Sequence, residues 1–318
     1  VERMNARAES APPLWRQLQL VAQAVQGVRE GRSLSAQLEQ VEPALRPGVQ
    51  ALSFHALRWL GTAEVLRRAL ARRAPPPAVD ALLCTALALA QPEPDALYEP
   101  FTLVNQTVEA ARRQPALRVQ SAFVNACLRR FLRERAALMA TALQDPVARW
   151  NHPRWWVERL KRDHPGHWQA ILAAAQQPAP MDLRVNLQRT EVAAFHAALA
   201  GVGVPAEALG GAAVRLHKPL PVQAIPGFAE GHASVQSAAA QRAAPLLLDG
   251  WQGAAPAVLD ACAAPGGKTA HLLELCADAR VTALEIAAAR SARIRDNLQR
   301  LGLQADVRVA DAADLPGW

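Results

Sequence analysis

The segment 260–269 combines residue types that can hold a nucleotide-like ligand. It reads Asp-Ala-Cys-Ala-Ala-Pro-Gly-Gly-Lys-Thr and overlaps the end of the apolar run 257–262. Pro265, Gly266 and Gly267 allow a sharp turn with no side chain in the way. Backbone N–H groups at the start of a following helix can then face an anionic or polar group. The pattern predicts a ligand-binding loop between a strand and a helix.

Two acidic residues lie at the ends of the next two predicted strands. Glu285 lies at the end of the apolar run 281–286, and Asp311 ends the run 306–311. Because the carboxyl ends of parallel strands meet at one edge of a sheet, both acids are expected beside the loop. There Glu285 would accept hydrogen bonds from two ribose hydroxyls. Asp311 would lie near an adenine amine.

Three ligand classes compete for this loop. A phosphate-binding P-loop contains Gly-Lys-Thr but needs a glycine five residues before Gly267, where Cys262 stands. A nicotinamide loop needs GxGxxG spacing, which is absent. S-adenosylmethionine brings a carboxylate and an adenosine without phosphates, so it suits two acids that would repel a polyphosphate. An ordinary strand–helix turn explains one glycine but not the whole segment. We therefore predict an S-adenosylmethionine site formed by Cys262, Ala263, Ala264, Pro265, Gly266, Gly267, Lys268, Glu285 and Asp311.

The elements around the loop predict an α/β domain. Strand, helix, strand, helix and strand follow one another, as in the first half of a doubly wound parallel sheet. The predicted ranges are a helix at 234–248, then 257–262, 268–277, 281–286, 287–302 and 306–311.

Two further regions precede this domain. Up to about residue 144 the apolar spacing is helical throughout, which predicts an all-α bundle with helices at 14–31, 49–73, 78–90, 101–113 and 119–143. The range 78–90 is apolar all round and is expected to be the central buried helix. Mixed short elements then predict a small α+β domain, with helices at 152–164 and 190–200, strands at 181–186 and 213–217, and Thr190 as a helix cap.

The length and net charge of the chain limit the number of domains and the kind of partner that are expected. A chain of 318 residues suggests two or three domains, and its formal net charge of +7 favours a polyanionic partner. The arginines most suited to contact RNA are 112, 113, 118, 129, 130, 133 and 135, although each alone also fits a solvated helix face. Trp155 and Trp156 could stack on bases, but packing is favoured. No apolar run is long enough to span a membrane.

Cysteine and histidine spacing gives no metal site. The four cysteines, Cys84, Cys127, Cys262 and Cys276, form no close pair such as CxxC, which indicates reduced thiols. His164 and His167 have helical spacing, but Pro165 and Gly166 interrupt the helix there and no third ligand is evident. A metal is therefore not expected.

The segment 260–269 closely resembles the S-adenosylmethionine motif of the cytosine-5 RNA methyltransferases. Residues 293–302 look like that family's helix after the second strand, and 151–156 with 182–186 resemble the small domain before its core. Residues 119–131 resemble the last helices of a NusB-like RNA-binding domain. This order is similar to that of the bacterial 16S (small-subunit) ribosomal RNA methyltransferases, and the resemblance covers nearly the whole chain.

The resemblance implies three domains and an activity. The domains would be a NusB-like helical RNA-binding domain at 1–145, a small α+β domain at 146–232, and part of a Rossmann-like methyltransferase domain at 233–318. The activity would be methylation of cytosine carbon 5 in small-subunit ribosomal RNA, with S-adenosylmethionine as cofactor. Ribosomal RNA would be the partner of a cytoplasmic monomer without metal or membrane attachment. Its RNA contacts would include Arg112, Arg113, Arg129, Arg130 and Arg133.

The chain departs from the family at three points. The family more often has aspartate at Glu285 and an acidic residue at Ser237. The family's Asp-Ala-Pro-Cys segment follows the fourth strand, and its nucleophilic cysteine lies further on. Neither is present in this sequence, so a C-terminal truncation and an inactive chain are expected. Cys262 resembles the cysteine of the cofactor motif, and Cys276 is expected to be a small buried helix residue. Two alternatives stay open: a non-catalytic RNA-binding or assembly protein, and a methyltransferase with a DNA or protein substrate.

Overall fold

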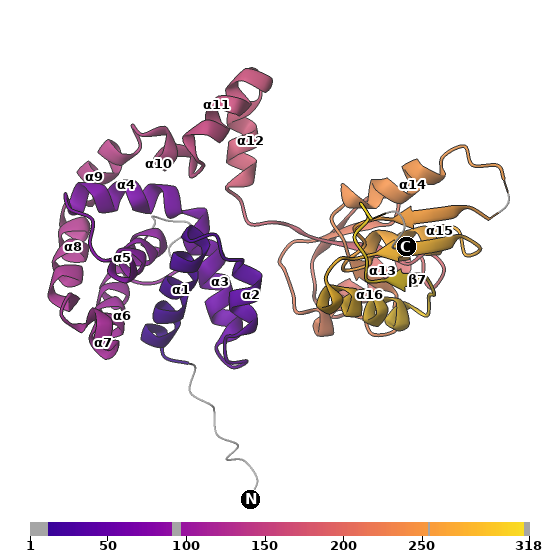
Figure 1. The fold of residues 1–318 in the computed structure, drawn as a ribbon, viewed down its shortest axis with the longest axis horizontal. Helices are drawn as coiled ribbons and strands as arrows, with labels where there is room; N and C mark the ends of the chain where they lie inside the picture. The colour runs from indigo at the N-terminus through magenta and orange to yellow at the C-terminus, as the bar shows by residue number, and fades with distance from the viewer. Residues whose placement is uncertain (1–11, 91–96, 254, 315–318) are drawn as a thin grey trace, which may run out of the picture. The chain divides into compact units, whose positions relative to one another are not determined.

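The computed structural model describes residues 12–90, 97–253 and 255–314 (Figure 1). The chain divides into two compact units, Val1–Gln177 and Pro178–Trp318, and each is described by itself. This division does not test the predicted boundaries at 145 and 232, which stay a prediction.

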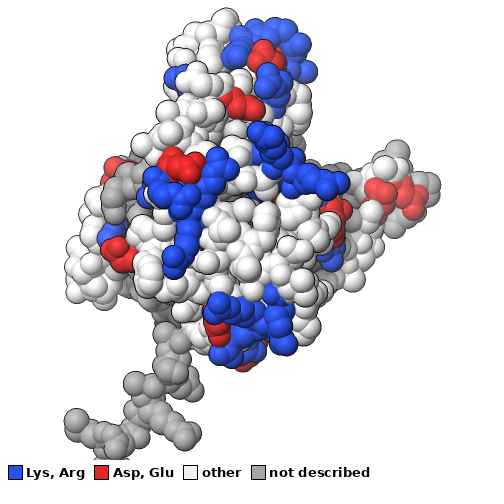
Figure 2. Space-filling model, turned by 90° about the vertical axis from the view of Figure 1, so that its left-hand side faces the viewer, with Lys and Arg blue, Asp and Glu red and all other residues white. Residues whose placement is uncertain are grey.

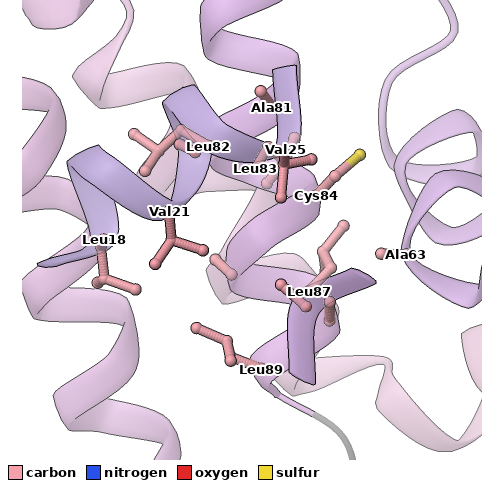
Figure 3. Packing of buried hydrophobic residues seen from close by; sticks show 14 of the residues in the cluster. Leu18, Val21, Val25, Ala63, Ala81, Leu82, Leu83, Cys84, Leu87 and Leu89 are labelled. Atoms are coloured by element: carbon pink, nitrogen blue, oxygen red, sulfur yellow. The ribbon is translucent and has the colours of Figure 1, made fainter. Parts of the chain in front are cut away.

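The first unit is helical in all the regular elements that the structure describes. Its core surrounds α5, which is buried on nearly every side, as the apolar sequence of that helix predicts. Figure 3 shows side chains of α1, including Leu18 and Val21, packed against those of α5. The helices are α1 (Leu14–Arg29), α2 (Leu34–Glu39), α3 (Arg46–Arg58), α4 (Leu60–Leu70), α5 (Pro77–Leu89), α6 (Pro100–Arg113), α7 (Pro115–Arg118), α8 (Ser121–Arg133), α9 (Arg135–Ala142), α10 (Pro146–Trp150), α11 (Arg154–Asp163) and α12 (Trp168–Ala175).

The long helix predicted at 49–73 is wrong, because the helix ends at Trp59 and a second one begins. The side chain of the residue directly after α10 explains the break: the Oδ1 atom of Asn151 accepts hydrogen bonds from the backbone N of Thr62 at 2.8 Å and from its hydroxyl at 3.0 Å. Gly61 also lies against this helix, since a Cβ there would be 2.5 Å from the carbonyl oxygen of Val147. The start of α4 is therefore capped by a distant residue, which local spacing does not reveal.

The helix predicted at 119–143 is also divided, at Glu134. This residue has φ −108° and ψ 17°, which lies outside the helical region. The chain resumes as α9, which packs against α4, and Arg135 donates to the carbonyl oxygen of Ala90 at 2.5 Å. Tertiary contacts thus override an uninterrupted apolar pattern.

The second unit begins with a four-stranded antiparallel sheet in the order β2-β3-β1-β4. Its strands and helix are β1 (Met181–Val185), α13 (Val192–Gly201), β2 (Ala206–Gly210), β3 (Ala213–Leu216) and β4 (Ala233–Val235), with a 3₁₀ turn η1 (Val222–Ala224) between β3 and β4. The side chains of β1, α13 and β3 form one core that includes Leu183, Phe195 and Val214. This arrangement confirms the mixed α+β character predicted for the region.

Two local predictions in this unit are wrong. Residues 234–248 are not one helix: β4 pairs with β1, and only the short turn η2 (Ala240–Arg242) and α14 (Ala243–Leu248) are helical. The chain leaves β4 along β1, and the backbone N of Ala238 donates to the carboxylate of Asp182 at 2.9 Å. Thr190 does not cap α13, which begins at Val192 with no side-chain cap.

A three-stranded parallel sheet in the order β5-β6-β7 follows. Its elements are β5 (Ala257–Asp260), α15 (Gly267–Leu275), β6 (Arg280–Leu284), α16 (Ala288–Leu301) and β7 (Asp306–Arg308). α15, α16 and the sheet share one apolar core, which includes Leu272, Ala283 and Ile294. Among the described residues β5 pairs only with β6, and Leu259 on β5 is 43% exposed. The predicted alternation of strands and helices is confirmed, although each strand is shorter than predicted.

Candidate functional site

The predicted cofactor loop connects the end of β5 to the start of α15. Its backbone is held by hydrogen bonds from the N of Ala263 to the carbonyl oxygen of Leu284 on β6 at 2.9 Å, and from the N of Gly266 to the oxygen of Ala263 at 2.6 Å. Ala263 and Gly266 are buried, whereas Cys262, Pro265 and Lys268 are exposed. Ala264 lies between these extremes and is joined to Pro265 by a cis peptide bond. The loop thus has a fixed backbone and an accessible outer edge.

Gly266 is the position in the loop where the backbone requires glycine. Its φ of +93° lies in the left-handed region that L side chains rarely adopt. A Cβ there would also lie 3.2 Å from the Cγ2 atom of Ile294 on α16. The next residue, Gly267, has no such φ, and the nearest atom to its Cβ position is 3.8 Å away on the side chain of Gln236. Glycine is therefore required for the backbone conformation at position 266 but not at position 267.

The two ends of the segment 260–269 are joined by a hydrogen bond. The hydroxyl of Thr269 donates to the Oδ2 atom of Asp260 at 2.7 Å, and Thr269 is fully buried. This contact links the last residue of β5 to the first turn of α15. It closes the loop at its base and keeps the intervening backbone in a narrow turn.

Glu285 directly follows β6 and is only 3% exposed. Its Oε1 atom accepts a hydrogen bond from the backbone N of Ala287 at 3.1 Å and lies 3.3 Å from the guanidinium of Arg290. Both contacts orient the side chain of Glu285. The structure therefore places a fixed carboxylate at the carboxyl end of the second parallel strand.

Asp311 follows β7 and is exposed. Its Oδ1 atom accepts a hydrogen bond from the backbone N of Ala313 at 2.9 Å, which orients the carboxylate in a turn. Because β5, β6 and β7 are parallel neighbours, the loop, Glu285 and Asp311 all lie at the carboxyl edge of one sheet. The structure brings the nine predicted cofactor residues to this edge.

A buried arginine that the sequence did not single out contacts the helix after the loop. Arg184 on β1 has a fully buried side chain that donates to both carboxylate oxygens of Glu274 on α15, at 2.7 and 2.9 Å. It also donates to the carbonyl oxygen of Gly267 at 2.8 Å. The only sequence signal was its position in a predicted strand.

The five predicted RNA-contact arginines separate into two groups. Arg130 and Arg133 both pair with Glu134, at 2.9 and 3.3 Å. Arg112 and Arg129 have no ion pair among the residues that the structure describes, and both are exposed. These two line a hollow of about 530 Å³ on the helical unit.

Arg113 lies in the same hollow. It pairs with Glu109 at 2.5 Å, and its guanidinium lies 4.6 Å from the ring centre of Trp15. The remaining lining is largely polar and comprises Asn105, Gln106, Val108 and Asn125. Figure 2 shows this unit from the side on which α8 lies in Figure 1, with Lys and Arg side chains gathered in separate clusters.

The cysteines differ in accessibility. Cys84 and Cys127 are buried in the helical core, and burial raises the pKa of Cys84 to about 11. Cys262 is exposed in the loop, and Cys276 directly follows α15 and is partly buried. In the described parts of the chain no group of three His, Cys, Asp or Glu side chains could hold a metal ion. None of the helices described is both long and apolar enough to cross a membrane.

Comparison with known proteins decides the family. Residues 152–223 match the ferredoxin-like domain of RsmF/B-like methyltransferases, and residues 248–318 match the 16S rRNA methyltransferase RsmB/F model. A ribosomal RNA small subunit methyltransferase B from Pseudomonas putida is 38% identical over 93% of this chain and 69% of its own length. The chain belongs to the RsmB/F methyltransferase family.

Two further comparisons agree. The ribosomal RNA small subunit methyltransferase B of Vibrio cholerae is 35% identical to this RsmB/F family member, over 99% of this chain and 71% of the relative. The crystal structure of PH0851 has the same fold, with a TM-score of 0.64, 19% identity, and coverage of 97% of this chain and 71% of that one. The small antiparallel sheet is thus part of a ferredoxin-like domain, and the parallel sheet is part of a methyltransferase fold.

Proposed function

We propose that this protein methylates carbon 5 of a cytosine in small-subunit ribosomal RNA, with S-adenosylmethionine as the methyl donor. The observation that carries the proposal is the arrangement at the carboxyl edge of the parallel sheet. There the glycine turn precedes α15, and the carboxylates of Glu285 and Asp311 follow the next two strands. Membership of the RsmB/F family supports the same reaction class and substrate.

The residues at this edge fit the proposed cofactor. A buried carboxylate at Glu285 suits two ribose hydroxyls, and its Oε1 atom is already oriented by contacts with Ala287 and Arg290. Asp311 would accept from the adenine amine, and residues Cys262–Lys268 would line the methionine end. S-adenosylmethionine supplies an electrophilic methyl group. The two acids disfavour the polyphosphate of ATP, and the loop lacks the GxGxxG spacing of a nicotinamide site.

The proposed chemistry needs a thiolate that adds to carbon 6 of the target cytosine, because carbon 5 is otherwise a poor nucleophile. The family resemblance assigns this step to a cysteine on a loop after a further strand. Cys84 and Cys127 are buried in the other unit, Cys262 belongs to the loop, and Cys276 follows the end of α15 that is remote from the loop. We therefore propose that the polypeptide of these 318 residues does not itself methylate RNA.

Ribosomal RNA would also contact the helical unit, which we propose is a NusB-like domain. The hollow lined by Arg112, Arg113 and Arg129 supports this, because it combines positive charge with carboxamide groups and an indole ring. Arginine side chains bind phosphates, and amides can hydrogen-bond unpaired bases. Arg130 and Arg133 share a carboxylate and would contribute less to binding.

The first test measures binding of the cofactor to the full-length enzyme, meaning a polypeptide that contains these residues and continues as its longer relatives do. Calorimetry should detect S-adenosylmethionine, and Asp311→Ala and Gly266→Val should each weaken its binding. ATP that binds more tightly than S-adenosylmethionine would contradict the cofactor assignment.

The second test measures tritiated methyl transfer to unmodified small-subunit ribosomal RNA. The full-length enzyme should be active, and the 318-residue polypeptide should not. If the 318-residue polypeptide is active and stays active with Cys262→Ala and Cys276→Ala, the proposal that it lacks the nucleophile is refuted. Turnover that only Cys276→Ala abolishes would identify Cys276 as the nucleophile instead.

A further inference from the structure

Arg184 is the largest fully buried side chain in the described part of the chain. A guanidinium removed from water is costly unless its N–H groups are paired. Its Nε and Nη2 atoms donate to the two carboxylate oxygens of Glu274, and Nη1 donates to the carbonyl oxygen of Gly267 and to the side chain of Gln236. Every nitrogen of the group is therefore used, and two of the three acceptor residues belong to α15.

These contacts hold α15 at both ends. Gly267 is the first residue of the helix and directly follows the cofactor loop, whereas Glu274 is the next to last. Gln188, four residues after Arg184, donates to the backbone oxygen of Glu274 at 2.7 Å and to that of Leu273 at 3.3 Å. The strand β1 and the turn after it thus fix both the axial position and the rotation of α15.

α16, which packs against the loop through Ile294, is attached to the same sheet. Arg189 donates to the carbonyl oxygen of Leu301 at 2.5 Å, at the end of α16. Arg300 on α16 donates in return to the oxygens of Phe228 at 2.6 Å and Ala233 at 3.1 Å. Both helices beside the loop are therefore held by the ferredoxin-like domain.

We propose that Arg184 is a positioning residue for the cofactor, and that through it the ferredoxin-like domain sets the affinity for S-adenosylmethionine. The inference rests on the proposed cofactor site. Arg184 holds the carbonyl oxygen of Gly267, which directly follows Gly266 and begins the helix whose N–H groups would face the methionine end of the ligand. Loss of this hydrogen bond lets the loop shift, and a shift of about 1 Å caused by a distant mutation can cost an enzyme about 100-fold in rate.

The experiment separates positioning from folding. Arg184→Met alone leaves Glu274 buried without a partner, which destabilises the fold. The double variant Arg184→Met/Glu274→Met replaces the ion pair by apolar groups of similar length, a change that is often neutral for stability. In the full-length enzyme the double variant should melt close to the wild type but bind S-adenosylmethionine at least about tenfold more weakly. Its affinity for ribosomal RNA should be unchanged.

A matched control is available in the same sheet. Arg215 on β3 pairs with Asp182 on β1 at 2.7 Å, and in the described part of the chain neither side chain is hydrogen-bonded to α15. Arg215→Met should leave the affinity for S-adenosylmethionine unchanged. An equal loss of affinity for S-adenosylmethionine in this control and in the double variant would show a general effect of the sheet, and it would overturn the role of Arg184.

Hydrogen exchange without any ligand distinguishes this proposal from the proposed function. The peptide that covers residues 260–275 should exchange faster in the double variant than in the wild type. Unchanged exchange in that peptide, or wild-type affinity for S-adenosylmethionine in the folded double variant, overturns the positioning role. A different outcome is that the wild-type enzyme binds no S-adenosylmethionine while exchange of this peptide is still faster in the double variant. That result refutes the cofactor assignment and the claim about affinity, and it supports only the claim that Arg184 stabilises the loop.

Discussion

Gly266→Ala should damage the cofactor loop, and the structure allows the size of the effect to be worked out. An L residue in the left-handed region costs about 1–2 kcal/mol, and Gly266 has φ +93°. The added methyl group would lie 3.2 Å from Cγ2 and 3.4 Å from Cα of the buried Ile294, so α16 must also shift. Such overpacking costs about 1–3 kcal/mol. The expected loss of unfolding free energy is therefore about 2–5 kcal/mol.

Two other glycines separate these contributions. Gly250 has φ +71° but no atom within 4 Å of its Cβ position, so Gly250→Ala should cost only the backbone term of about 1–2 kcal/mol. Gly267 lacks a positive φ and begins α15, so alanine there should be neutral or stabilise by up to about 1 kcal/mol. The three variants together test conformation, crowding and helix propensity.

The assay must report on the second unit alone, because a chain with two compact units need not unfold in one step. Hydrogen exchange of peptides that cover β5 and β6, followed against urea, gives a local free energy of opening for this unit. Affinity for S-adenosylmethionine is measured on the same variants. A Gly266→Ala protein as stable as Gly267→Ala, with unchanged cofactor affinity, would refute the proposed geometry of the turn.

Three further predictions use other parts of the chain. Burial and the nearby guanidinium of Arg184 lower the pKa of His271 from 6.5 to about 4. The free energy of unfolding should therefore be highest above pH 6.5 and fall by up to roughly 3 kcal/mol toward pH 4. Urea unfolding at several pH values should show that His271→Leu flattens this dependence. Arg112→Glu with Arg129→Glu should weaken RNA binding and its salt dependence, whereas Arg130→Glu should have a smaller effect in filter-binding titrations. Cys84 should resist iodoacetamide at pH 8 until the protein unfolds, as mass spectrometry would show, since burial raises its pKa to about 11.

The elements around the cofactor loop could be predicted because their signals are local. Strand, glycine turn and helix follow one another within 260–269, and the acids at the next strand ends are placed by the parallel topology alone. The central helix α5 was equally clear, since a segment that is apolar all round must be buried. Each of these predictions depends on residues that are neighbours in the chain.

Other features depend on partners far away in the sequence. The break at Trp59 is fixed by Asn151, whose side chain caps α4 from 89 residues away. β4 is a strand only because β1 is available to pair with it, so residues 234–248 read as a helix when taken alone. Tertiary partners of this kind leave no trace in hydrophobic spacing.

The arginine in β1 illustrates the same limit at the candidate site. An arginine in a short strand is usually expected to face solvent, yet Arg184 is fully buried because Glu274, 90 residues later, supplies a bidentate partner. Neither residue is unusual for its own element, and only their contact makes them notable. Spacing rules for helices and strands reach at most a few positions, so this pair required the structure.

The glycine turn and the buried arginine constrain the same loop by independent contacts. Gly266 can adopt φ +93° because it lacks a side chain, which Ile294 on α16 would crowd, and Arg184 fixes the next residue through its carbonyl oxygen. Both constraints require that α15 and α16 stay in place, and each of these helices is hydrogen-bonded to the antiparallel sheet or its connecting turns. The ferredoxin-like domain therefore directly supports the carboxyl edge of the parallel sheet, where we propose that the methyl donor binds.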